Sequence, residues 1–172
     1  MIRNILIAAI LMFATSAFAQ TAPTGDEQRT EMKKLEQMVG QWKGSGWIMQ
    51  NAKRETFTGT ENVQSKLGGL ALLVEGKYTN DKGAVIHETF GVISYEPKKK
   101  NYRFSTYLAS GVAGEQELTL VEGGWQWGIQ FPSGSIRYTT KMSNDEWFET
   151  GEISQDGKNW RQFFEMKLQR VK

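Results

Sequence analysis

The chain has 172 residues, with 21 basic and 19 acidic side chains, no cysteine and one histidine. Disulfides need cysteine pairs and structural zinc sites need several Cys or His ligands, so this composition excludes both. A formal net charge of +2 is too small to attract nucleic acid or an anionic membrane strongly, and neither is an expected partner.

Residues 1–19 are predicted to be a signal peptide. Arg3 supplies a positive start, the run ILIAAILMFA is too short to span a bilayer, and Ala-Phe-Ala before Gln20 fits a cleavage site. A transmembrane anchor is the alternative interpretation. Cleavage would leave 153 residues with a net charge of +1. We therefore expect a periplasmic or secreted protein without a membrane span.

Residues 20–25 read as a flexible leader, and residues 26–172 as a single domain. The domain is predicted to begin with one short amphipathic helix, because apolar residues recur at three- and four-residue spacing: Met32, Leu35, Met38 and Val39. Asp26 or Thr30 is a possible cap at its start, and Gly40 is a natural stop.

After Gly40 the pattern becomes that of β-strands. Short runs rich in β-branched and aromatic residues recur about every ten residues, with turn residues between them. Alternation is clear near position 127, where Trp125, Trp127 and Ile129 share one face. Alternation of this kind is typical of half-buried antiparallel strands, and the connections are too short for parallel crossovers. The predicted fold is all-β: an up-and-down antiparallel barrel of about ten strands with a short N-terminal helix.

The stretch GQWKGSGW, residues 40–47, marks the start of this barrel. We expect Trp42 to plug the barrel floor beside the helix. Gly44 and Gly46 lie on the same face as Trp42 and would let the strand bend sharply and be approached closely. Trp47 lies on the other face.

The same residues carry a family resemblance. Gly40, Trp42, Gly44 and Gly46 form a G-x-W-x-G-x-G pattern that resembles the first strand of calycin (lipocalin-like) barrels, and of nitrobindins in particular. The segments LGGLALLVEGKY and FGVISYEPKKKNYRFSTYLASG resemble a large bacterial family, often exported, of calycin-like domains of unknown function. Both resemblances imply a barrel of this type.

Nitrobindins bind haem through a histidine in their last strand, and the resemblance can be tested there. The matching segment is FFEMKLQR, in which Leu168 and Arg170 fit the pattern but Phe163 occupies the ligand position. We therefore expect no haem and no other cofactor.

Five residues are candidates for a ligand site inside the barrel: Glu75, His87, Glu88, Arg103 and Tyr107. They lie on successive predicted strands, so inward members would share one wall. Because side chains alternate, His87 and Glu88 cannot both face inward, and the sequence does not decide between them. An inward Arg103 with a tyrosine hydroxyl would suit a carboxylate-bearing apolar ligand. The more ordinary alternative is that these residues form outward cross-strand pairs.

The sequence therefore favours an exported protein that binds a small, largely apolar or carboxylate-bearing molecule in its lumen. The alternatives are an enzyme that uses an interior Glu or His as acid or base, a haem-binding barrel, and an envelope protein that acts through its surface. Nothing in the sequence indicates an oligomeric state.

Overall fold

A computed structural model describes residues 25–143 and 145–172. The predicted signal peptide and residues 20–24 of the predicted leader lie outside the described residues. The elements are α1 (Asp26–Lys33), a 3₁₀ turn (Glu36–Met38), β1 (Gly40–Gln50), β2 (Lys53–Lys66), β3 (Ala71–Thr79), β4 (Val85–Glu96), β5 (Asn101–Leu108), β6 (Ala113–Val121), β7 (Gly124–Phe131), β8 (Gly134–Ser143), β9 (Glu146–Ser154) and β10 (Arg161–Arg170).

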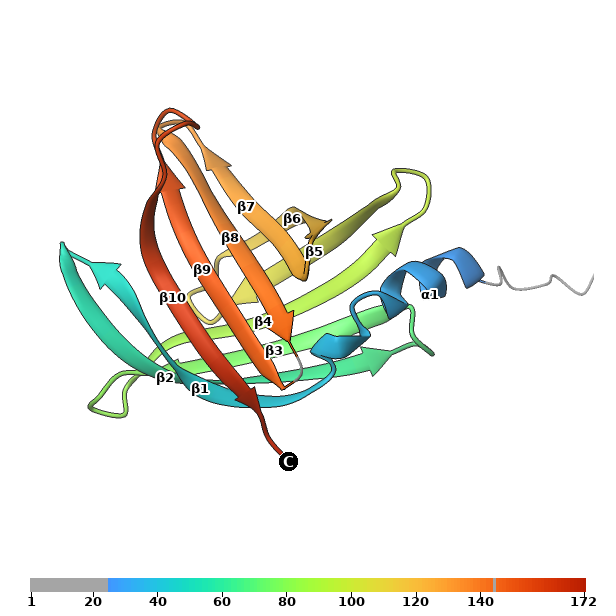
Figure 1. The fold of residues 1–172 in the computed structure, drawn as a ribbon, viewed down its shortest axis with the longest axis horizontal. Coiled ribbons are helices and arrows are strands. Elements are labelled where there is room, and N and C mark those ends of the chain that lie inside the picture. Colours follow the sequence, from blue (N-terminus) through green and yellow to red (C-terminus); the bar gives the residue numbers. More distant parts are fainter. Residues whose placement is uncertain (1–24, 144) are drawn as a thin grey trace, which may run out of the picture.

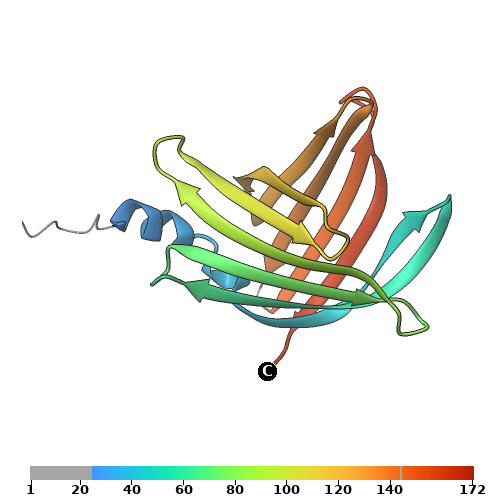
Figure 2. The ribbon, with the colours of Figure 1, turned by 180° about the vertical axis from the view of Figure 1, so that it is seen from behind.

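The ten strands form one closed antiparallel barrel, which confirms the predicted fold. Each strand pairs with its neighbours in sequence, and β10 pairs with β1 to close the sheet (Figures 1 and 2). Tight connections make this order possible. The β1–β2 loop has two residues, Asn51 and Ala52, both with positive φ, the conformation of a primed hairpin turn. Among the described residues, no helix is long and apolar enough to span a bilayer.

The N-terminal helix is shorter than the apolar pattern predicts. The helix ends at Lys33, and the 3₁₀ turn follows it. Met32, Leu35 and Met38 stay buried against the barrel while the chain bends into β1. Neither predicted cap acts as one, because Gly25 is the N-cap and the Thr30 hydroxyl donates to the Asp26 carbonyl at 2.8 Å.

Gly40 also differs from its predicted role, because it opens β1 instead of ending the helix. It has φ 138°, and a Cβ there would lie 2.5 Å from Arg170 Nη1. The Arg170 guanidinium lies in the space that a side chain at Gly40 would take, and it donates hydrogen bonds to the carbonyls of Gln37 and Val39. The last strand thereby secures the junction between the 3₁₀ turn and β1.

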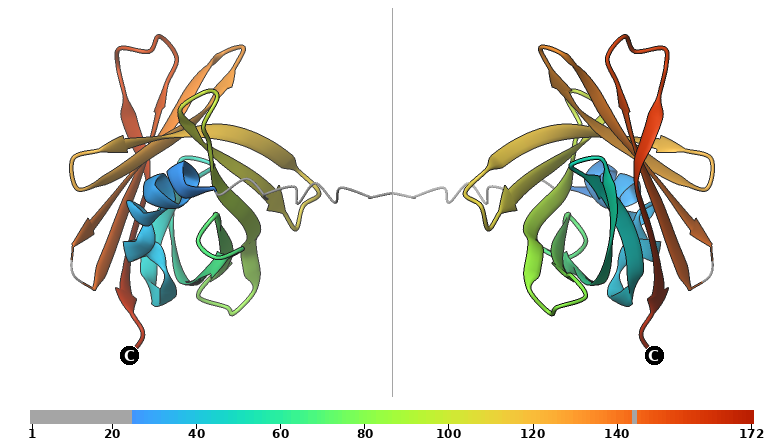
Figure 3. Two further views of the ribbon diagram at one scale, coloured as in Figure 1. Left: turned by 90° about the vertical axis from the view of Figure 1, so that its right-hand side faces the viewer. Right: turned by 90° about the vertical axis from the view of Figure 1, so that its left-hand side faces the viewer.

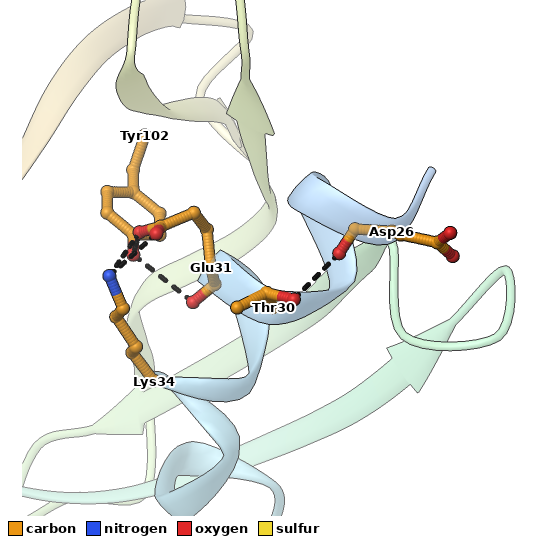
Figure 4. A network of polar contacts seen from close by, with 5 residues as sticks. All are labelled: Asp26, Thr30, Glu31, Lys34 and Tyr102. Atoms are coloured by element: carbon orange, nitrogen blue, oxygen red, sulfur yellow. Dashed lines mark hydrogen bonds and ion pairs between the residues drawn. The ribbon is translucent and has the colours of Figure 1, made fainter. Parts of the chain in front are cut away.

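Helix α1 lies over one end of the barrel and is tied to the wall there (Figure 3). The Tyr102 hydroxyl, at the start of β5, donates to the Glu31 carboxylate at 2.8 Å, and Lys34 Nζ donates to the same carboxylate at 2.6 Å (Figure 4). Burial and the neighbouring Glu31 carboxylate raise the pKa of Tyr102, so the hydroxyl keeps the proton that it donates. This end of the barrel is closed.

Trp42 forms the floor at this end, as the sequence predicts. Its ring is 1% exposed, Nε1 donates to the Met38 carbonyl at 2.8 Å, and the Arg170 guanidinium lies 4.1 Å from its ring centre. Gly44 and Gly46 allow the close approach of β10: a Cβ on them would lie 2.0 Å and 2.2 Å from backbone oxygens of that strand. The tryptophan plug and the glycines beside it are thus one feature.

The opposite end of the barrel is splayed. Pairing between β6 and β7 covers only residues 118–121 and 124–127, and pairing between β1 and β10 stops at Ile48 and Phe164. Beyond these points the described strands separate, and β7–β10 rise away from β2–β6 (Figures 1 and 2). The interior can therefore be reached from the end remote from α1.

Candidate ligand-binding cavity

A cavity of about 550 Å³ lies inside the barrel, between the Trp42 floor and the splayed end. Its wall is mostly apolar and includes the aromatic side chains of Phe57, Tyr78, Phe104, Trp125, Trp127, Tyr138, Trp147 and Phe164. The rings support one another: those of Trp127 and Tyr138 are stacked with centres 4.3 Å apart, and those of Phe57 and Phe164 with centres 5.7 Å apart. The side chains of the ten strands thus leave part of the interior unfilled.

Glu61 is one of two buried carboxyls on this apolar wall. It alternates inward on β2 with Phe57, Gly59 and Val63, and is 8% exposed. The Tyr78 hydroxyl of β3 donates to Oε1, whereas Oε2 has no hydrogen-bond partner among the described residues. Burial and, to a smaller extent, the charge of Glu149 raise the pKa of Glu61 to about 7, although the hydrogen bond from Tyr78 opposes this rise.

Two glycines make room for this carboxyl–tyrosine pair. A Cβ on Gly76 would lie 2.6 Å from Glu61 Oε1, and a Cβ on Gly59 would lie 2.3 Å from the Tyr78 ring. Any larger residue at either position would displace one member of the pair. The backbone is therefore shaped around Glu61 and Tyr78.

Glu149 is the second buried carboxyl and comes from β9. Its Oε2 accepts hydrogen bonds from Thr140 Oγ1 at 2.8 Å and Trp147 Nε1 at 3.2 Å. Burial raises the pKa of Glu149, and these two hydrogen bonds oppose that rise because they favour the ionised form. The cavity thus contains two carboxyls that receive their hydrogen bonds from neutral donors.

His87 lies at the splayed end, on the inner face of β4, and lines the cavity. Its ring centre is 5.5 Å from that of Tyr78, and Nε2 is hydrogen-bonded to the Thr89 hydroxyl. Desolvation lowers the pKa of His87, which favours the neutral ring at neutral pH. Of the two neighbours between which the sequence did not decide, His87 faces inward. Glu88 faces outward, where it pairs with Lys77 at 3.6 Å.

The other predicted site residues also lie on the outer face, so of the five only His87 lines the cavity. Glu75 accepts hydrogen bonds from Asn62 at 3.0 Å and Gln64 at 3.3 Å. Arg103 pairs with the Glu115 carboxylate, and the exposed Tyr107 ring packs against Phe90 with centres 6.0 Å apart. These are the cross-strand pairs that the sequence offered as the alternative. A ligand-binding role for the four outward residues stays a prediction, but it cannot be exerted in the lumen.

Phe163, which stands where the nitrobindin pattern has its histidine, lies where the β10 register shifts between Gln162 and Phe164. Its ring contacts that of Tyr138, with centres 5.8 Å apart. Within the described ranges, no group of three or more His, Cys, Asp or Glu side chains is placed to hold a metal ion.

Residues 27–170 match the sequence profile of a family described as a protein of unknown function, DUF1579. The chain belongs to the DUF1579 family. No curated protein matches it.

Two solved structures share the fold of this DUF1579 protein. Rv2717c from M. tuberculosis superimposes with a TM-score of 0.62 at 11% identity, over 82% of this chain and 97% of that one. The S-type phycobiliprotein lyase CPES from Guillardia theta gives a TM-score of 0.56 at 11% identity, over 81% and 92% of the two chains. At this identity the likeness concerns the fold alone, and it agrees with the calycin-like barrel predicted from the sequence.

Sequence reasoning missed the two buried carboxyls of this DUF1579 protein. The pattern that could have found them is strict alternation: Glu61 shares a face with Phe57 and Val63, and Glu149 shares a face with Trp147. In each case a carboxylate sits two residues from an apolar side chain that is better suited to a core than to a surface.

Proposed function

We propose that this protein is an exported binding protein that holds a small, largely apolar ligand in the barrel interior. The observation that supports this most strongly is the 550 Å³ cavity, which is lined by aromatic and other apolar side chains, closed at the Trp42 end and reachable at the splayed end. Its volume is within the usual range for small-molecule sites, and such sites combine an apolar wall with a few placed polar groups. Glu61, Glu149 and His87 are among the polar groups here.

A neutral, environment-sensitive dye tests the proposal. N-phenyl-1-naphthylamine should bind at one saturable site per chain, with a rise in fluorescence. Thr106→Trp should weaken this binding at least tenfold, because Thr106 lines the cavity and a tryptophan there would fill the space. The measurement is a fluorescence titration of the wild-type protein and the variant.

Tyr107→Trp is the matched control, because Tyr107 is the next residue of β5 and is 52% exposed on the outer face. It should leave dye affinity unchanged. If Tyr107→Trp weakens the dye and Thr106→Trp does not, the dye binds the outer surface and the lumen proposal fails.

The proposal includes export, with cleavage after residue 19. It is supported by the Arg3 start, the short apolar run and the Ala-Phe-Ala site of the sequence. N-terminal sequencing of the protein from its own cells should begin at Gln20. Material that begins at Met1 would contradict export by this route.

Acid–base catalysis in the same cavity is a second candidate, and one observation favours it. Glu61 has a pKa of about 7, the range in which a general acid or base works best near neutral pH. Recovery of the natural ligand chemically unchanged after prolonged incubation would leave binding alone as the function.

A further inference from the structure

The charged side chains that line the cavity are acidic. Among the described residues that line it there is no lysine or arginine. Its buried ionisable carboxyls are those of Glu61 and Glu149, while Glu115, at the rim, pairs with Arg103 on the outside. His87 does not supply a cation, because desolvation lowers its pKa.

We propose that the ligand carries a cationic nitrogen, such as a protonated amine or amidine, on an apolar body, and that Glu61 and Glu149 bind this nitrogen. The inference rests on the proposed function and adds to it the chemical class of the ligand. The first support is the unfilled capacity of the carboxyls to accept hydrogen bonds.

Glu61 is more than nine-tenths buried, and its Oε2 has no hydrogen-bond partner within the described part of the chain. In Glu149 both neutral donors, Thr140 and Trp147, bind the same oxygen, Oε2. A buried carboxylate is costly unless a partner offsets the loss of water. An N–H group with positive charge supplies both the missing donor and the missing charge.

The aromatic wall is the second support. Cations are attracted to the faces of tryptophan and tyrosine rings. The cavity offers the stacked Trp127 and Tyr138, and also Trp125 and Trp147, whose rings meet edge to face at 5.7 Å. A cationic nitrogen that leaves water can therefore lie between aromatic faces and carboxyls. The apolar body of the ligand then covers the remaining wall.

This inference replaces the carboxylate-bearing ligand that the sequence suggested. That expectation depended on an inward Arg103, and Arg103 lies outside. An anionic head group would enter a space of low dielectric that contains two carboxyls and no lining lysine or arginine. We expect such ligands to be excluded.

Displacement of N-phenyl-1-naphthylamine by three naphthalene compounds with different head groups tests the inference. The compounds are 2-(1-naphthyl)ethylamine, 2-(1-naphthyl)ethanol and 1-naphthylacetate, compared at pH 7.5. The amine should displace the dye at a concentration at least tenfold below that of the alcohol, and the acetate should be the weakest.

Variants show whether Glu61 and Glu149 cause the preference for the amine over the alcohol. Glu61→Gln and Glu149→Gln should each reduce the amine-to-alcohol ratio at least threefold, while Glu75→Gln, on the outer face, should leave it unchanged. The same ratio in wild type and in both cavity variants would overturn the assignment to these carboxyls. Dye displacement without an amine preference overturns the inference and leaves the proposed function intact. Failure of the neutral dye to bind the wild-type protein overturns both.

Discussion

Truncation of Trp42 to alanine is expected to lower the free energy of unfolding by about 3 to 5 kcal/mol, the range for large aromatic residues removed from a core. The ring is fully buried, its N–H is bonded to the Met38 carbonyl, and it packs edge to face on Trp147 with centres 5.7 Å apart. Its loss would leave a hole in the barrel floor and remove the ring on which the Arg170 guanidinium packs. Urea-induced unfolding, followed by circular dichroism, gives the value.

Trp47→Ala is the matched control, because Trp47 lies on the same strand but on the outer face, where the Arg54 guanidinium covers it at 4.0 Å. It should cost about 1 kcal/mol or less, since it is only partly buried and leaves no core cavity. Equal losses for the two variants would show that Trp42 has no special role as the floor.

The pH dependence of stability should change strongly in Glu61→Gln. The pKa of Glu61 rises from an ordinary value of 4.5 to about 7 on folding, mainly through burial. Between these two values the folded state binds more protons than the unfolded state, so stability falls as pH rises through this window. At about 1.4 kcal/mol per pKa unit, Glu61 costs on the order of 3 kcal/mol by pH 8.

Glu61→Gln removes this cost. The difference in unfolding free energy between the variant and the wild type should therefore shift by about 3 kcal/mol in favour of the variant as the pH rises from 5 to 8. Glu149 has a raised pKa and acts in the same direction, and His87, with a lowered pKa, acts in the opposite direction. Both remain in the variant, so their effects largely cancel in the difference. Parallel pH profiles for the two proteins would contradict a buried, shifted Glu61.

Much of the fold could be predicted because alternation and turn chemistry are local properties. Trp125 and Trp127 share a face in the sequence and line the cavity together in the structure. Trp42 could be placed because a large ring follows closely after the predicted amphipathic helix. The helix itself was overestimated, since a 3.6-residue period does not distinguish an α-helical turn from the 3₁₀ turn that follows Lys33.

The site was harder to predict, because alternation shows which residues share a face but not which face is inside. On β5, Arg103 alternates with the apolar Tyr102 and Phe104, so its outward direction was available from the pattern. On β4, neither face was clearly more apolar, and only the pairing with β3 placed His87 inside. Glu61 escaped notice because only two large apolar side chains, Phe57 and Val63, share its face of β2.

The link between Glu61 and Tyr78 depends on contacts across strands, which no local pattern encodes. Their meeting requires that Gly59 pair with Tyr78 and Gly76 with Glu61 in the β2–β3 register. Each glycine then leaves its side-chain space to the residue opposite. A single sequence shows these glycines only as residues that interrupt a strand.

The claim that the lumen is the ligand site is tested most directly by a crystal structure of the protein with N-phenyl-1-naphthylamine bound. We predict electron density for the dye inside the barrel, against Phe104, Trp127 and Phe164, which line the cavity. On the outer face, Phe90 and Tyr107 line a second, shallower groove. Density only in that groove, with side chains filling the interior, would contradict the claim.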